Sequence, residues 1–391
     1  MDRKKEIGIV AYGETKIDFK TGRSAYDLAS EVFEQILNKT GLEPKDIDGL
    51  AVSETMSETN NPFYSVYMAE MLGITTRWNQ VTGLGGASTI ANIARAHSAI
   101  RDGYCETVLV IAADAQSSMK GGAAEQGAQR YEFQYPTGLR GPVGVFGLLT
   151  QRYRHLYNLK DEALAKLAVT QRNHALLNEN AYEKLRKPIT VQDYLNSKVI
   201  SDPLRMLDSV MVCDGANGVL VTTTKNANRL GLNKIVFPIA YSEISNYNGA
   251  DLSAEITNTG FEIVGPEVLR KAGMTTKDVR MLQAYDDFFI ALMLVMEGVG
   301  FCERGGASDF ILANDFSFNG SLPLNTGGGQ ISSGQAGLAG GGTNFVEAVR
   351  QMFEEGGARQ ISNPNNALVT GIGMIPYGRN WGVSNALILE A

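Results

Sequence analysis

Apolar residues recur along this chain with two different periods, and the change between them predicts helices and strands in turn. Residues 24–40 place an apolar side chain every three or four positions, with Ser24 as a helix N-cap and Gly41 just past the helix end. Residues 107–113 (TVLVIAA) form a near-continuous apolar run, which favours a strand covered on both faces. Because strands and helices alternate in this way, the pattern predicts an α/β fold built on a mainly parallel sheet.

The other elements of the first half follow from the same pattern. Strands are predicted at residues 7–12, 47–52, 78–81 and 217–223, and helices at 60–72 and 87–101. Residues 114–200 break the rhythm, because they are polar and rich in Tyr, Gln and Arg, and become mostly helical only after Phe146. We interpret them as an inserted loop or cap domain.

The second half of the chain repeats the order of the first. The matched pairs are 41–53 with 273–285, 82–101 with 326–353, and 107–113 with 367–372. In the first pair a glycine, a Lys-Asp dipeptide, a β-branched residue and a leucine fall in register. Matches in the same order predict a duplicated α/β unit. The chain then divides into an N-terminal half (1–113 plus 201–225), the insert (114–200) and a C-terminal half (226–391).

Composition and charge limit the classes of function that are open to this chain. The 391 residues are 44% apolar and 20% charged, as in a globular protein, and the net charge of −7 argues against nucleic-acid binding. No apolar run approaches the roughly 20 residues that span a bilayer, and the N-terminus lacks a signal core. We therefore expect a cytoplasmic protein with no membrane contact. Three cysteines and three histidines lie far apart, so no disulfide framework or metal site is expected.

The most unusual stretch is 325–342 (NTGGGQISSGQAGLAGGG), which carries eight glycines in eighteen residues. Glycine costs backbone entropy on folding, so such a stretch is typical of places where backbone must approach something closely. A flexible linker is the alternative, but linkers do not usually carry Gln330, Ile331 and Gln335 among their glycines.

If the two halves pack about a pseudo-two-fold axis, their equivalent loops converge at the carboxyl ends of the strands. The converging segments would be the turns 82–87 and 372–380, the strand end 285–288 and the stretch 325–342. The turn at Leu84 leads directly into a helix, so its backbone amides would be free to bind a carbonyl oxygen or an oxyanion.

Three motifs at these places resemble the thiolase superfamily, in the branch similar to sterol-carrier-protein thiolases. They are VMVCDGANGVLV at 210–221, YDDF at 285–288 with Gly-Phe-Cys at 300–302, and the stretch 325–342. The resemblance covers nearly the whole chain. It implies a duplicated, five-layered αβαβα fold, a homodimer core, and coenzyme A thioester substrates lying across the inserted loop domain.

The chain departs from this family where the chemistry lies. Leu84 stands where the family keeps its acyl-accepting cysteine, Tyr285 and Gln335 stand where it has histidines, and Gly371 replaces a second cysteine. A thiolase of the usual kind needs a thiolate to hold the acyl group and a base to form that thiolate. Leucine and glutamine can do neither, so we do not expect an acyl-enzyme intermediate for this chain acting alone.

The remaining chemistry is a carbon–carbon bond change without a covalent intermediate. Tyr285 would give or take a proton, the backbone amides of Leu84 and Gly373 would hold the enolate oxygen, and Gln335 would orient a carbonyl or a water. Candidate contacts with substrate or coenzyme A are Gly85, Gly86, Asp286, Asn325, Gly328, Gly329, Ser332, Tyr377 and Asn380.

The resemblance leaves three functions open. The leading hypothesis is coenzyme A-dependent thiolysis of a β-ketoacyl-CoA, with 2-benzoylsuccinyl-CoA of anaerobic aromatic degradation as the candidate, giving benzoyl-CoA and succinyl-CoA. The first alternative is a retro-aldolase acting on a β-hydroxyacyl-CoA, although the retro-aldolases of this branch carry a second tyrosine where this chain has Gln335. The second alternative is a non-catalytic scaffold.

Relatives of both active kinds associate with a small zinc-ribbon/OB-fold subunit, so zinc is expected only in such a partner. Coenzyme A is expected as a cosubstrate, with no covalently bound cofactor.

Overall fold

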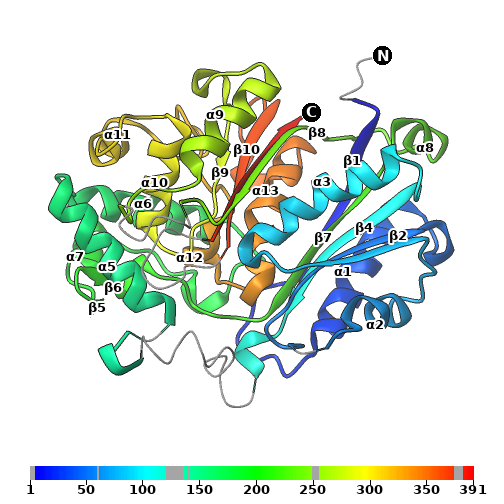
Figure 1. Ribbon diagram of the computed structural model, residues 1–391, viewed down its shortest axis with the longest axis horizontal. Helices are drawn as coiled ribbons and strands as arrows, with labels where there is room; N and C mark the ends of the chain where they lie inside the picture. The colour runs from blue at the N-terminus through cyan, green and yellow to red at the C-terminus, as the bar shows by residue number, and fades with distance from the viewer. Residues whose placement is uncertain (1–4, 60, 120–134, 140, 249–254, 374–381) are drawn as a thin grey trace.

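The structure is a computed structural model that describes residues 5–59, 61–119, 135–139, 141–248, 255–373 and 382–391. Two β-sheets lie side by side, with helices between them and on both outer faces (Figure 1). This is the αβαβα layering of the duplicated fold that the resemblance implied.

The first sheet has the strand order β1-β7-β4-β2-β3. Its strands are β1 (Ile7–Glu14), β2 (Gly49–Ser53), β3 (Trp78–Thr82), β4 (Thr107–Asp114) and β7 (Gly215–Thr223). Strand β2 runs parallel to β3 and β4, but β7 runs antiparallel to both β1 and β4.

The second sheet has the order β8-β11-β10-β9. Its strands are β8 (Phe237–Ser245), β9 (Leu282–Gln283), β10 (Asn366–Gly373) and β11 (Val383–Glu390). Only β9 and β10 pair in parallel. The prediction of a mainly parallel sheet is therefore wrong, since both sheets are mixed. A strand in the middle of a sheet is buried on both faces whichever way its neighbours run, so its apolar run does not reveal direction.

Helices α1 (Ala25–Thr40) and α2 (Tyr64–Met71) cover the outer face of the first sheet. The predicted caps of α1 are confirmed: Ser24 and Asp27 form a capping box, and Gly41 is left-handed with φ 69°. On the far side of the molecule, α9 (Phe261–Ala272) and α10 (Phe289–Val299) cover the second sheet.

The central layer consists of α3 (Ser88–Arg101) and α13 (Thr343–Met352), which lie between the two sheets (Figure 1). Their apolar faces share one core with strands of both sheets. These are the helices of the matched segments 82–101 and 326–353, so the internal repeat predicted from the sequence appears as two central helices in contact with both sheets.

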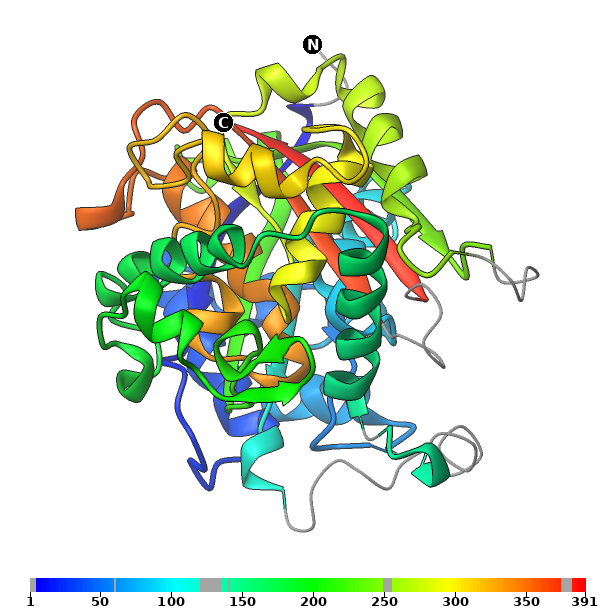
Figure 2. The same cartoon turned by 90° about the vertical axis from the view of Figure 1, so that its left-hand side faces the viewer.

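The insert packs beside α10 and adds its own small sheet (Figure 2). It contains α5 (Gly141–Leu156), α6 (Asp161–Leu176) and α7 (Val191–Leu195), followed by β5 (Val199–Ser201) and β6 (Leu204–Arg205). Within the described residues, the other α-helices are α8 (Thr224–Arg229), α11 (Ala307–Ala313) and α12 (Gly329–Ser333). Phe146 of α5 stacks on Phe288 at a ring-centroid distance of 4.0 Å, which brings the insert next to the strand end at 285–288.

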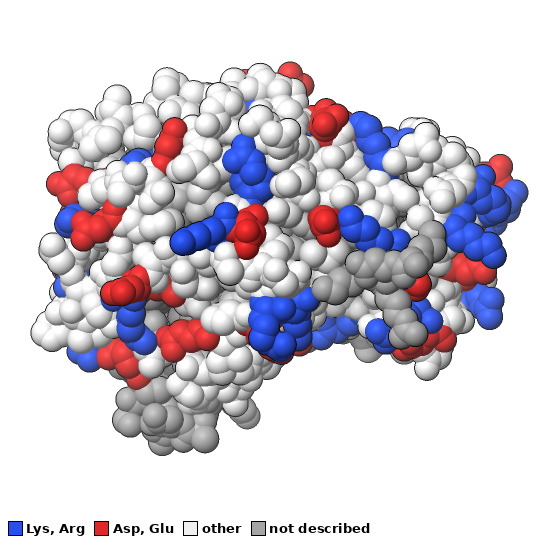
Figure 3. Space-filling view, turned by 90° about the horizontal axis from the view of Figure 1, so that it is seen from above, with Lys and Arg blue, Asp and Glu red and all other residues white. Residues whose placement is uncertain are grey.

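Acidic and basic side chains are interspersed on the face shown in Figure 3. Ion pairs also occur in the insert, where Arg152 pairs with Glu255 at 2.6 Å and Arg154 pairs with Asp161. These two arginines of the insert are therefore already engaged by carboxylates. Within the described ranges, no helix combines the length and apolarity needed to cross a bilayer.

Candidate active site

The loops of the two halves meet so closely that only glycine fits at the contact. A Cβ atom on Gly86 would lie 2.0 Å from the ring of Tyr285, and one on Gly341 would lie 2.1 Å from the carbonyl oxygen of Gly86. A Cβ on Gly373 would lie 2.2 Å from the carbonyl oxygen of Leu84. The structure therefore brings together the turn at Leu84, the strand end at Tyr285 and the glycine-rich stretch, as predicted.

Tyr285 and Gln335 form a hydrogen-bonded pair. The Nε2 of Gln335 donates to the Tyr285 hydroxyl and to Gln330 Oε1, each at 3.2 Å. The backbone of Gln335 is held on both sides, because its N–H donates to Met211 O at 2.9 Å and its carbonyl accepts from Cys213 N at 2.7 Å. The side chain of Tyr285 is only 7% exposed. The pair is thus fixed in place at the edge of the buried core.

The environment of Tyr285 keeps its phenol protonated at neutral pH. Burial raises the pKa of Tyr285 well above its usual value, and the negative charges of Asp287 and Asp286 raise it further. A phenol in this state donates a hydrogen bond and does not act as a base. Of the two roles expected for Tyr285, the geometry favours the proton donor.

Asp286, which the sequence favoured as a pocket residue, is instead part of the support beneath the site. Its Oδ1 accepts from the backbone N–H of Gln330 and from Asn344 Nδ2, both at 2.9 Å. A Cβ atom on Gly329 would lie 2.1 Å from Asp286 Oδ2, so there is no room for a ligand between these two residues. Burial raises the pKa of Asp286 to about 7.

Asp287 is the neighbouring carboxylate, which the sequence favoured less than Asp286 as a pocket residue. Burial, followed by the charge of Asp286, raises its pKa to about 7. Its Oδ1 is buried and has no hydrogen-bond partner among the described residues. The spacing could have indicated Asp287, because side chains two residues apart in an extended segment point to the same side, and Asp287 lies two residues after Tyr285.

The backbone amides at the turn differ in availability. The amide of Leu84 donates to Ser88 Oγ at 2.9 Å, so it is already engaged. Gly85 and Gly86 are the first two residues of the short 3₁₀ turn Gly85–Ala87. Their backbone amides donate to no acceptor in the described part of the chain. An oxygen of a substrate would therefore meet free donors one or two residues after Leu84.

Several predicted contact residues lie behind the site. Both side-chain atoms of Asn325 bond the backbone of Ala284, at 2.8 and 3.0 Å, and Asn325 is fully buried. Gly328, Gly329 and Ser332 are buried as well. These residues shape the floor of the site and do not form its surface. The predicted contacts Tyr377 and Asn380 lie outside the described residues.

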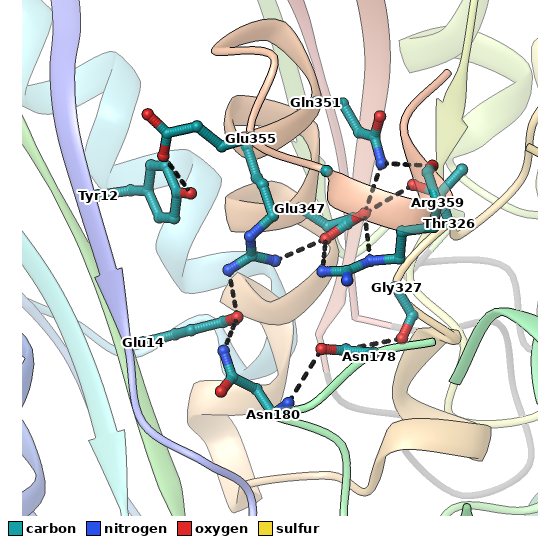
Figure 4. A network of polar contacts seen from close by, with 12 residues as sticks. Tyr12, Glu14, Asn178, Asn180, Thr326, Gly327, Glu347, Gln351, Glu355 and Arg359 are labelled. Atoms are coloured by element: carbon teal, nitrogen blue, oxygen red, sulfur yellow. Dashed lines mark hydrogen bonds and ion pairs between the residues drawn. The ribbon is translucent and has the colours of Figure 1, made fainter. Parts of the chain in front are cut away.

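A buried ionic network holds the glycine-rich stretch from behind (Figure 4). Glu347 accepts from Arg350 at 2.6 Å, from Arg359 at 3.0 Å and from the Thr326 hydroxyl at 3.0 Å. Burial alone would raise the pKa of Glu347, but the charges of Arg359 and Arg350 outweigh it and lower the pKa to about 2. Glu347 is therefore a fixed anion that anchors the start of the stretch.

A cavity of about 450 Å³ lies elsewhere, beside β3 and α3. Trp78, Arg95, Tyr104, Tyr241 and Glu243 are among its lining residues, and Tyr285 and Gln335 are not. We therefore locate the candidate active site by the residues that converge there, and not by the size of this cavity. Within the described residues, no three His, Cys, Asp or Glu side chains are grouped to hold a metal ion.

Comparison with known proteins agrees with this geometry. Residues 243–379 match the family model described as "Thiolase C-terminal domain-like". The chain is 31% identical over 364 residues to a 17-hydroxy-3-oxo-4-pregnene-20-carboxyl-CoA lyase of Mycobacterium tuberculosis, covering 89% of this chain and 91% of that protein. It is 30% identical to a steroid side-chain-cleaving aldolase of Thermomonospora curvata, covering 93% and 94% of the two chains.

One solved structure is similar over nearly its full length. It is described as an Ltp2-ChsH2(DUF35) aldolase, and it has a TM-score of 0.82 and 28% identity, covering 99% of this chain and 98% of that one. Subunit BbsB of benzoylsuccinyl-CoA thiolase from Thauera aromatica is 26% identical, but over only 54% of each chain.

The chain belongs to the thiolase superfamily, in the branch similar to sterol-carrier-protein thiolases. It is an enzyme of that class, whose relatives are thiolase-like acyltransferases and carbon–carbon lyases acting on coenzyme A thioesters.

Substitution of Gly86 tests the contact between the halves. Gly86→Ala should lower the free energy of unfolding by about 1–3 kcal/mol, because the new methyl group overlaps the ring of Tyr285. Gly83→Ala is the matched control, since its methyl group would meet only the end of the exposed Glu54 side chain, which can move. Urea denaturation measures both variants, and an equal effect in the two would contradict the contact.

Substitution of Asp287 tests the buried charge. Its raised pKa means that the folded state holds the proton more tightly than the unfolded state, so ionisation destabilises the fold as pH rises from about 4 to 7. Asp287→Asn should therefore gain stability on the order of 2 kcal/mol at pH 8, and less at pH 5. Thermal unfolding at both pH values measures this gain. The exposed Asp102→Asn serves as the control, and a gain that is independent of pH would refute the assignment.

Proposed function

We propose that this enzyme cleaves the Cα–Cβ bond of a β-hydroxyacyl-CoA in the retro-aldol direction. The observation that carries the proposal is a complete thiolase frame in which Leu84 replaces the nucleophile and the Tyr285–Gln335 pair occupies the reacting end. The similarity to two lyases or aldolases over most of the chain supports this function over thiolysis, which was the leading hypothesis from the sequence. The half-length similarity to BbsB is weaker support for thiolysis.

The retro-aldol reaction needs no acyl-enzyme. The β-hydroxyl gives its proton to a water molecule, its oxygen forms a C=O bond to Cβ, the Cα–Cβ bond breaks, and the electron pair passes through Cα onto the thioester oxygen. An aldehyde or ketone leaves, and the enolate takes up a proton from water at Cα to give a shorter acyl-CoA. Every covalent change occurs in the substrate, so a leucine at position 84 does not impair it.

The enzyme must stabilise the enolate oxygen as its charge develops. We assign this role to the amides of Gly85 and Gly86, with those of Leu84 and Gly373 beside them. The Leu84 amide would contribute only by leaving Ser88 Oγ. Tyr285 supplies a further neutral donor, because its phenol remains protonated at neutral pH.

The proposal is tested with the thioester named for the mycobacterial relative, 17-hydroxy-3-oxo-4-pregnene-20-carboxyl-CoA. Retro-aldol cleavage gives the 17-ketone and propionyl-CoA without added coenzyme A, and mass spectrometry measures both. The parallel assay contains 2-benzoylsuccinyl-CoA with free coenzyme A. Formation of benzoyl-CoA and succinyl-CoA there, with no cleavage in the first assay, would overturn the proposal in favour of thiolysis. No turnover in either would favour the scaffold.

We further propose a homodimer core joined by a small zinc-ribbon/OB-fold subunit. Strand β3 is the edge of the first sheet, and next to it α2 presents exposed apolar side chains. These are Phe63, Val66, Tyr67 and Met71. An edge strand beside an exposed apolar face favours pairing with a second copy of the chain. The solved aldolase, described as Ltp2 with ChsH2(DUF35), supports a second kind of subunit.

Tyr285→Phe tests the hydrogen-bond donor. The variant should lose about 10²–10³-fold in kcat while the Kd for the thioester changes little, because only the hydroxyl is removed. Turnover and thioester binding are both measured on the assembled enzyme, with the exposed Tyr104→Phe as the control. Turnover of Tyr285→Phe equal to that of the control would remove Tyr285 from the mechanism.

Val66→Glu tests the proposed dimer face. A charge in the centre of an apolar interface should convert the dimer to a monomer, because the carboxylate would be desolvated on association. Light scattering after size-exclusion chromatography measures the mass. Val191→Glu, on the exposed side of α7, is the control. A dimer that persists in the Val66→Glu variant would place the interface elsewhere.

A further inference from the structure

The side-chain amide of Gln335 has a fixed orientation. An amide nitrogen carries two hydrogens, and both are used: one goes to the Tyr285 hydroxyl and one to Gln330 Oε1, each at 3.2 Å. Gln330 is itself held, because its backbone N–H donates to Asp286 Oδ1 at 2.9 Å. The anchored backbone of Gln335 prevents the residue from swinging away.

The carbonyl oxygen of the same amide is left as an acceptor. Its Oε1 receives no hydrogen bond from the described residues, and the residue is only half-buried, so the oxygen can be reached from outside. No proton can be placed on this oxygen near neutral pH, since a primary amide does not titrate. The position therefore offers a hydrogen-bond acceptor and cannot become a donor.

Tyr285 has the opposite polarity. Its hydroxyl oxygen accepts a hydrogen from Gln335, so its own proton is the group with which it can donate. The pair thus presents one acceptor and one donor next to each other, in an order that the hydrogen bonds fix. A β-hydroxyacyl thioester carries the complementary groups close together, a hydroxyl that donates and a thioester carbonyl that accepts.

We propose that Gln335 Oε1 accepts the β-hydroxyl of the substrate and thereby makes the site select β-hydroxyacyl over β-ketoacyl thioesters. A β-keto group has no hydrogen to give, so its oxygen would face the amide oxygen with neither satisfied. Sites built to bind a hydroxyl discriminate strongly against analogues that lack it, because the protein group is left unpaired. This inference rests on the proposed function and names the specificity residue of that site.

The test compares two thioesters that differ only at the β carbon, 3-hydroxybutyryl-CoA and acetoacetyl-CoA. Calorimetry measures the Kd of each for the assembled wild-type enzyme, which should prefer the hydroxy compound about tenfold or more. Gln335→Met keeps the length of the side chain but has no acceptor, so the preference should fall to about twofold or less. The exposed Gln192→Met is the matched control and should behave as wild type.

The outcomes separate this inference from the proposed function. Equal affinity of the wild type for both thioesters, with retro-aldol turnover present, would overturn the role of Gln335 and leave the function intact. A preference that persists in Gln335→Met would show that pocket shape, and not the acceptor, discriminates, and would also overturn it. Failure of both thioesters to bind would overturn the inference, and the function would then be decided by turnover of the steroid thioester alone.

Discussion

The site depends on direct contact between the backbones of the two halves at positions where no Cβ atom can fit. The contacts are Gly341 against Gly86, Gly371 against Ala87, and Gly373 against Leu84. Such close approach brings amide groups of one half next to side chains of the other, so each half alone would present an incomplete site. The glycines required here lose more backbone entropy on folding than any other residue, and the surrounding core must offset that loss.

Packing behind the glycine-rich stretch explains how so flexible a composition is held in one conformation. Glu347 binds Thr326 on one side and two arginines on the other, while Asn325 clamps the backbone of Ala284. A buried ionic network of this kind is weak evidence for stability, because desolvation offsets most of the attraction. Its effect is geometric: with every partner satisfied, one arrangement of the stretch is favoured over others. The orientation of Gln335 follows from this support, through Asp286 and Gln330.

Periodicity and internal repetition were enough to predict most elements and the convergence of Leu84, Tyr285 and Gln335. Those features depend on local propensity and on the symmetry of a duplicated chain. Strand direction was not predictable, because a buried strand such as β7 is equally apolar in either direction. The supporting role of Asp286 was also not predictable, because it depends on single contacts with Gln330 and Asn344. Likewise, the engagement of the Leu84 amide by Ser88 is a single side-chain contact that no pattern encodes.

The residues at positions 84, 285 and 335, which replace the family's cysteine and histidines, all suit the same kind of chemistry. Burial would disable a tyrosine that had to ionise, but the same burial suits a tyrosine that must remain a neutral donor. Beside it, a glutamine provides an acceptor that no change of pH can remove, and a leucine excludes any competing nucleophile. The thiolase frame keeps its amide donors for an enolate oxygen, which both thiolysis and retro-aldol cleavage require. A site of this kind lacks the groups for covalent transfer and retains those for breaking a carbon–carbon bond whose electrons flow into a thioester.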